Sequence, residues 1–155
     1  IKKLDSIAQL TELRSLNISH NSIDSIEPLG AISGLLDVDI SANQIKDLSP
    51  LQYHPGLTNI EAADNNISDL QPLRNLSQLE ELDLSNNRLS DITPLESVIS
   101  IRALNLSGNS IASVKPLEDL GELEFLEIDG NPLTCAELKK LTRVLGSDVV
   151  ENICR

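Results

Sequence analysis

Aromatic residues are almost absent from this chain of 155 residues. It has no tryptophan, and Tyr53 and Phe125 are its one tyrosine and its one phenylalanine. Large rings therefore cannot form the core, and leucine and isoleucine must supply the buried side chains. The chain also lacks an apolar run of 18 residues, so no segment is predicted to span a membrane as a helix. No secretory signal is visible.

Basic residues are scarce compared with acidic ones. The chain has 12 lysines and arginines against 24 aspartates and glutamates, which gives a formal net charge of -12. Nucleic-acid binding requires a cationic footprint on the protein, so this composition argues against a nucleic-acid partner. The charge fits a protein that repels anionic surfaces and attracts a basic partner.

Residues that commonly serve catalysis are few and dispersed. Only two histidines occur, His20 and His54, and neither a glycine-rich phosphate loop nor a convergent Ser/His/Asp set can be recognised. His54 takes the place of a leucine in an apolar pattern, and we interpret it as a core residue rather than a ligand. No enzyme activity, cofactor or metal centre is predicted.

Cysteine is equally rare, and both cysteines lie in the last 21 residues. Cys135 and Cys154 do not provide the four ligands that a structural zinc site requires. Because both belong to one small C-terminal segment, we expect a disulfide between them, which would indicate an oxidising compartment. Two unrelated buried thiols are the alternative.

A repeat of 22 residues organises the rest of the chain. Asparagine recurs at this spacing, at Asn21, Asn43, Asn65, Asn87, Asn109 and Asn131. An apolar frame accompanies each asparagine, as in Leu79, Leu82, Leu84, Asn87, Leu89, Ile92 and Leu95. A fixed period in this range predicts a solenoid. We interpret the six asparagines as structural, since a buried amide at each strand exit can pair with backbone groups that the turn leaves unpaired.

Each repeat begins with the pattern L-x-x-L-x-L, whose alternating end predicts a short strand with one buried face. Equivalent segments must pair in parallel, so the sequence predicts six parallel strands centred near Leu16, Val38, Ile60, Leu82, Leu104 and Leu126. A proline recurs in each return segment, at Pro28, Pro50, Pro72, Pro94 and Pro116. Proline suits a first helical turn and interrupts a longer helix, so 3₁₀ or irregular turns are expected on the convex side.

The C-terminal segment has the features of a helical cap. Thr134 and Glu137 form a capping-box pattern, apolar residues follow at helical spacing, and Gly146 ends the pattern. The predicted organisation is therefore a set of repeats over residues 1–133, of which the first is truncated, and a cap over residues 134–155 that consists of a helix at 135–145 and a tail. Because Ile1 falls in mid-repeat, an N-terminal cap is expected upstream.

The pattern L-x-x-L-x-L-x-x-N-x-I/L occurs six times within residues 1–133 and resembles the leucine-rich repeat superfamily. The repeat length and the recurring Pro-Leu resemble the short-repeat subclass found in bacterial internalins and in the regulatory repeat subunit of protein phosphatase 1. The segment Gly130-Asn131-Pro132-Leu133-Thr134-Cys135, with a late Cys154, is similar to secreted bacterial repeat proteins that have a disulfide-closed cap. The resemblance implies an α/β solenoid, a horseshoe whose concave face binds proteins, in a secreted, periplasmic or cell-surface location.

The strand residues that point away from the core should form the concave face. Seven of these eighteen positions are acidic and none is lysine or arginine. Asp39, Glu61 and Asp83 are expected to stack about 4.8 Å apart, where like charges repel and the fold gains nothing. We therefore predict a partner-binding face formed by Asp37, Asp39, Glu61, Glu81, Asp83, Phe125, Glu127 and Asp129. The alternatives are a general excess of acid without function and a Phe125 that packs beneath the cap.

Three functions are consistent with this pattern. The predicted one is a protein-interaction module, expected to be a monomer, that binds a basic partner surface. The second is a structural spacer within a longer cell-surface protein, with no ligand of its own. The third is a divalent-cation site in the column of Asp39, Glu61 and Asp83, since hard cations bind carboxylate oxygens, although no ligand loop accompanies these residues.

Overall fold

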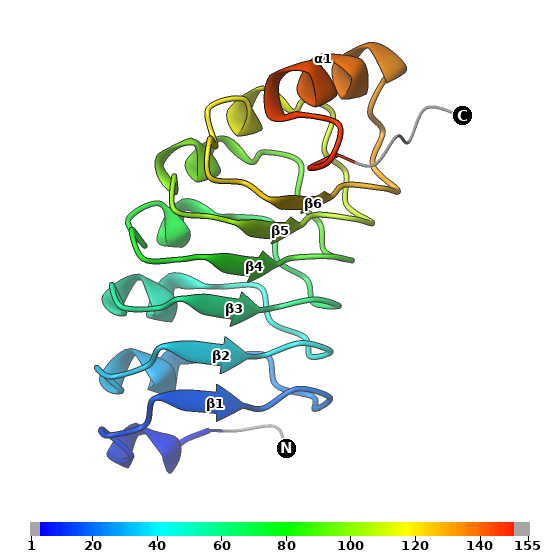
Figure 1. The fold of residues 1–155 in the computed structure, drawn as a ribbon. Coiled ribbons are helices and arrows are strands. Elements are labelled where there is room, and N and C mark those ends of the chain that lie inside the picture. Colours follow the sequence, from blue (N-terminus) through cyan, green and yellow to red (C-terminus); the bar gives the residue numbers. More distant parts are fainter. Residues whose placement is uncertain (1–3, 151–155) are drawn as a thin grey trace.

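The computed structural model describes residues 4–150 and shows a stack of similar turns (Figure 1). One sheet of six short parallel strands forms one side of the stack, and each strand pairs with the next one along the chain. The strands are β1 (Ser15–Asn17), β2 (Asp37–Asp39), β3 (Asn59–Glu61), β4 (Glu81–Asp83), β5 (Ala103–Asn105) and β6 (Phe125–Glu127). The predicted number, order and centres of the strands are confirmed.

Short 3₁₀ helices form the opposite, convex side of the solenoid. They are η1 (Ile7–Gln9), η2 (Glu27–Ala31), η3 (Ser49–Tyr53), η4 (Gln71–Leu73), η5 (Thr93–Ser97) and η6 (Lys115–Leu117). Proline occupies a first-turn position in all but η1. Its fixed φ favours that turn and its missing N–H is not needed there, which explains why the prediction of short convex turns is confirmed.

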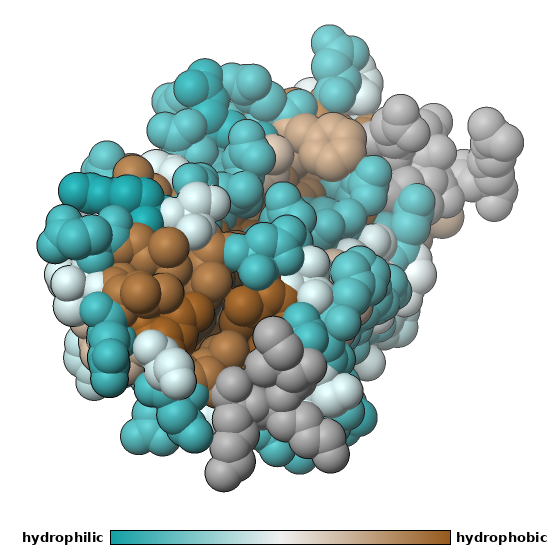
Figure 2. Space-filling view, turned by 90° about the horizontal axis from the view of Figure 1, so that it is seen from below, coloured by the Kyte–Doolittle hydropathy of each residue, from teal (hydrophilic) through white to brown (hydrophobic). Residues whose placement is uncertain are grey.

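The hydrophobic core lies between the sheet and the convex helices, and it is continuous from the first turn to the last. The inner turns bury their apolar columns almost completely; Ile32 is 0% exposed, whereas its first-turn equivalent Leu10 is 53% exposed. Apolar side chains are accordingly visible at the β1 end of the stack (Figure 2). Outer turns of a stacked repeat have a neighbour on one side only, so the first turn buries less surface than the inner ones.

A residue with left-handed backbone follows each strand and directly precedes each repeat asparagine. These residues are His20, Ala42, Asp64, Asn86, Gly108 and Gly130, with φ between 52° and 71°. The left-handed conformation reverses the chain at the strand exit. It is unfavourable by about 1–2 kcal/mol for most residues other than glycine, and less so for asparagine and aspartate. The turn is therefore held by other interactions, and the sequence analysis did not anticipate this feature.

The repeat asparagines provide those interactions through a ladder of hydrogen bonds. Asn43 is typical: its Nδ2 donates to the carbonyls of Ile18 and Ile40, both at 3.0 Å, and its Oδ1 accepts the N–H of Ile23 at 3.0 Å. Asn65, Asn87, Asn109 and Asn131 repeat this arrangement one turn further on each time. Each amide thus joins two successive turns, while its contribution to stability stays a prediction.

The one α-helix within residues 4–150, α1 (Cys135–Leu145), covers the last turn as the predicted helical cap (Figure 1). Thr134 and Glu137 form the expected capping box, and Leu138 and Leu141 are the buried residues of the helix. Cys154 lies outside the described residues, so its pairing with Cys135 stays a prediction, as does the division of the chain between residues 133 and 134. None of the helices within residues 4–150 is long and apolar enough to cross a bilayer.

Candidate protein-binding face

The concave face consists of two columns of side chains that point away from the core. Leu16 and its equivalents at the strand centres point inward, so the residues on either side of them point outward. The first column contains Ser15, Asp37, Asn59, Glu81, Ala103 and Phe125, and the second contains Asn17, Asp39, Glu61, Asp83, Asn105 and Glu127. Successive members of each column are neighbours in the sheet, which brings most of the predicted site residues together.

Three carboxylates follow one another in the second column. Asp39 is in register with Glu61, and Glu61 with Asp83. At the spacing of parallel strands, each neighbouring pair repels by about 1 kcal/mol in water. The described residues contain no group of three or more side chains arranged to hold a metal ion, so this geometry gives the divalent-cation alternative no support.

Part of this column stabilises the fold, contrary to our expectation from the sequence. Oδ1 of Asp39 accepts the backbone N–H of Ser41 at 3.0 Å, and Oδ1 of Asp83 accepts that of Ser85 at 2.8 Å. Asn17 and Asn105 make the same bond to the residue two positions later. A short acid or amide is favourable here because it satisfies a donor in the turn. Asp39 and Asp83 therefore contribute to the fold, and the expectation that the fold gains nothing from them was wrong.

The remaining charge is concentrated at the middle of the face. Asp39 also accepts a hydrogen bond from Asn17 Nδ2 at 2.7 Å, and Glu127 accepts one from Asn105 Nδ2 at 2.9 Å. Neither Glu61 nor Glu81 accepts a side-chain hydrogen bond within the described part of the chain. Together with Asp83 they form an acidic group on β3 and β4, which we call the central acids.

The cations of the described residues do not neutralise the central acids. The two ion pairs found there join Arg102 to Glu124 at 2.6 Å and Lys140 to Glu118 at 2.8 Å. Neither pair belongs to the outward columns. Arg102 lines a depression beside Glu81 and Phe125, but its ion pair is with Glu124, whose hydrogen bond and charge raise the pKa of Arg102.

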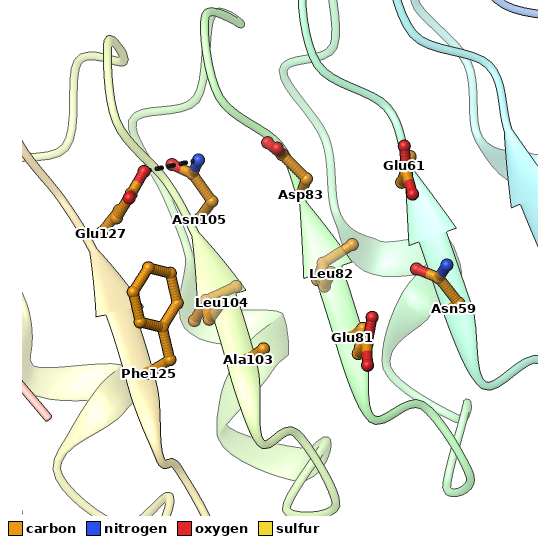
Figure 3. A pocket seen from close by; sticks show the side chains of 10 residues that line it. All are labelled: Asn59, Glu61, Glu81, Leu82, Asp83, Ala103, Leu104, Asn105, Phe125 and Glu127. Carbon is orange, nitrogen blue, oxygen red and sulfur yellow. Dashed lines mark hydrogen bonds between the residues drawn. The ribbon is translucent and has the colours of Figure 1, made fainter.

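A shallow hollow of about 360 Å³ lies between the central acids and Phe125 (Figure 3). It is lined by Asn59, Glu61, Glu81, Leu82, Asp83, Ala103, Leu104, Asn105, Phe125 and Glu127. Ala103 is the smallest outward side chain of its column, and it stands between Glu81 and Phe125 in the sheet register. Its small size leaves the space that the hollow occupies. The sequence analysis did not recognise this role, although a small residue between two large ones was a visible signal.

Phe125 is exposed on this face. Its side chain is 49% exposed, and its ring stands at the edge of the hollow beside Ala103 and Leu104 (Figure 3). Phe125 also lines a second depression with Asp148 and Val149 of the cap, so its use for partner binding rather than for packing against the cap stays a prediction. Three predicted residues lie apart from the hollow: Asp37 and Asp39 are on β2, and Asp129 follows β6 in the second depression.

Comparisons with known proteins agree with this architecture. The family model described as Leucine Rich repeats (2 copies) matches residues 11–53 and 55–97, and the model described as Leucine Rich Repeat matches residues 100–123. The chain belongs to the leucine-rich repeat family. A comparison with curated protein sequences finds no match.

Solved structures of bacterial leucine-rich repeat proteins resemble the chain closely. An internalin (inlF) from Listeria monocytogenes is 30% identical with a TM-score of 0.87, over 99% of this chain and 47% of that one. Internalin C2 from the same species is 33% identical with a TM-score of 0.81, over 86% of this chain and 57% of that one. A leucine-rich repeat protein from Leptospira interrogans is 28% identical with a TM-score of 0.84, over 90% of this chain and 37% of that one. The chain thus spans about half or less of these relatives' length, and the resemblance to internalins is confirmed.

Proposed function

We propose that the chain is a protein-interaction module that binds a basic surface of a protein partner through its concave face. Leucine-rich repeat domains are generally protein-interaction modules, and this general class applies to the chain through its family. The finer proposal depends on one observation: within residues 4–150 the central acids Glu61, Glu81 and Asp83 form no ion pair, and they border a hollow with an exposed aromatic ring.

The physical basis of the proposal is complementarity of charge and shape. A concave acidic surface concentrates negative potential, which steers a cationic partner toward it and increases the rate of encounter. Phe125 adds an apolar contact at one end of the hollow, and exposed aromatic residues often contribute much of the binding energy of an interface. The preferred ligand is therefore a segment with lysine or arginine next to an apolar side chain.

We also propose that the chain functions outside the cytoplasm and as a monomer. Its similarity to bacterial internalins supports a bacterial origin and a location outside the cytoplasm. A disulfide between Cys135 and Cys154 would persist in an oxidising compartment and would secure the tail against α1.

A peptide array tests the proposed function. The array presents peptides in which lysine or arginine is placed next to an apolar residue, beside matched peptides in which glutamine replaces the basic residue. The protein should bind the basic peptides selectively, and the triple variant Glu61→Gln, Glu81→Gln, Asp83→Asn should lose that binding. Asparagine at position 83 keeps the turn bond, as Asn17 and Asn105 show.

A second triple variant provides the matched control. Asp47, Asp69 and Asp91 lie before convex helices, and each accepts a backbone N–H from the residue two positions later. Changing all three to asparagine removes the same charge and keeps the same kind of turn bond, but it leaves the concave face intact. Equal loss of binding in both variants would show that only net charge matters. No binding by the unmodified protein would favour a structural spacer.

A further inference from the structure

His54 occupies an apolar column of the core directly after η3. Its equivalents in the other turns are Leu10, Ile32, Leu76, Val98 and Leu120. The side chain of His54 is 1% exposed, yet neither ring nitrogen has a hydrogen-bond partner among the described residues. A buried polar group without a partner is unfavourable. The ring therefore sits where an aliphatic side chain would be more stable.

No charged group near His54 acts as its counter-ion. The 3₁₀ helices η2 and η4 pack against η3. The titratable residues on or beside these three helices are all exposed: Asp24, Glu27, Lys46, Asp47, Tyr53, Asp69 and Arg74. The neighbouring strands add Asp37, Asp39 and Glu61, which belong to the concave face. Since both ring nitrogens are unpartnered, none of these groups is bonded to the imidazole.

We propose that His54 is an acid-sensitive switch: when the imidazole binds a proton from solvent, its charge cannot remain in the apolar core, and η3 opens away from η2 and η4. A charge without a counter-ion is far more costly to bury than a neutral ring. The solenoid permits such a local opening, because each turn contacts only its neighbours. The chain leads from His54 into β3, so the opening would also loosen the attachment of Asn59 and Glu61 at the hollow.

The direction of the pH dependence follows from the environment of the ring. Burial lowers the pKa of His54. The Leu29 backbone near the ring opposes this shift to a smaller extent, although it does not meet the geometry of a hydrogen bond to either ring nitrogen. A histidine that is exposed in the opened chain has a pKa of about 6.5. The opened state therefore binds the proton more readily than the closed state. The stability that depends on neutral His54 is complete above a pH of about 6.5 and is lost as the pH falls below it.

Urea unfolding between pH 8.0 and 5.5 tests the proposal with three proteins: the unmodified chain, His54→Leu and His20→Asn. Leucine is the residue found at equivalent positions, so it fits the column, and His20 is the chain's other histidine, exposed in a turn. Relative to His54→Leu, the unfolding constant of the unmodified chain should rise below about pH 6.5 by up to tenfold per pH unit. His20→Asn should follow the unmodified chain. Identical pH dependence of the unmodified chain and His54→Leu would overturn the proposal.

Two measurements at single-residue level distinguish a switch from a general acid effect. The Leu57 amide donates to the His54 carbonyl at 3.0 Å, so its hydrogen exchange reports opening of this segment. Exchange at pH 5.5 should be faster in the unmodified chain than in His54→Leu, and the difference should vanish at pH 7.5. The His54 ring, followed by NMR in the folded protein, should stay neutral well below pH 6.5. A ring that titrates near pH 6.5 without faster exchange would contradict the proposal.

Discussion

Replacement of Asn87 by alanine tests how the ladder holds each strand exit. Its Oδ1 accepts the N–H of Ile67 at 2.9 Å, and its Nδ2 donates to the carbonyls of Ala62 at 2.9 Å and Leu84 at 3.1 Å. Both carbonyls keep a second donor in the variant, because Asn65 also donates to Ala62 and Asn109 also donates to Leu84. The N–H of Ile67 is the group that loses its acceptor.

The expected loss of stability comes mainly from the Ile67 N–H, which loses its acceptor, and less from the two carbonyls, which keep a donor. An unsatisfied buried N–H costs about 1–3 kcal/mol, and the loss of the shared bonds adds about 1 kcal/mol. Asn87 is half-buried, so water can reach part of the vacated space. We therefore expect Asn87→Ala to lower the free energy of unfolding by about 2–3 kcal/mol, measured by guanidinium unfolding monitored with circular dichroism. Asn75→Ala, at an exposed asparagine outside the ladder, is the control. Equal midpoints for the two variants would refute a structural role for the ladder.

Three further predictions concern other parts of the molecule. Gly108→Ala should destabilise the fold by about 1–2 kcal/mol, because Gly108 has φ +67° and an added Cβ would overlap Oδ1 of Asn86. Gly121→Ala is the control, since an added Cβ there meets nothing within 4 Å. It should change the free energy of unfolding by less than about 0.5 kcal/mol in the same unfolding assay. Thiol titration of the unfolded, unreduced protein should find no free sulfhydryl if Cys135 and Cys154 are bonded, and two free thiols would contradict the disulfide. Phe125→Ala should increase the dissociation rate of a basic peptide with little change in its association rate, measured by surface plasmon resonance; an unchanged dissociation rate would remove Phe125 from the interface.

The fold was predictable because the repeat encodes it several times over. The spacing of Leu82, Leu84 and Asn87 recurs in each turn, so an error in one turn would be corrected by the others. Side-chain size at fixed spacing determines which residues enter the core, and Pro94 and its equivalents limit the convex side to short helices. These signals are local and need no knowledge of long-range contacts.

The left-handed residues were missed because they share a conformation and not a chemistry. Ala42 has no tendency toward positive φ, whereas glycine at positions 108 and 130, and Asp64 and Asn86 in the same place, were a partial signal. The structural role of Asp39 and Asp83 also went unrecognised. Its signal was the short acid or amide that recurs at this position, as in Asn17 and Asn105, since such a side chain accepts the backbone N–H two residues later. Sequence reasoning counted these acids as surplus charge because the turn geometry was unknown.

The turn bonds of the acidic column determine which acids can be substituted to test binding without disturbing the fold. Asp39 both accepts a turn bond and pairs with Asn17, so its substitution would combine effects on stability and binding. Glu61 and Glu81 have no such role among the described residues, and Asp83 can be replaced by asparagine without loss of its turn bond. The central acids are therefore the residues at which charge can be removed with the least effect on the fold.

The association rate of a basic peptide, measured over a range of salt concentrations, tests the central claim most directly. The peptide is one selected on the array, and the proteins are the unmodified chain, the central-acid triple variant and the convex triple variant of Asp47, Asp69 and Asp91. The account predicts that the central-acid variant associates more slowly and with a flatter salt dependence, while the convex variant keeps the behaviour of the unmodified chain. Unchanged association of the central-acid variant, at every salt concentration, would place the binding site on another face and contradict the account.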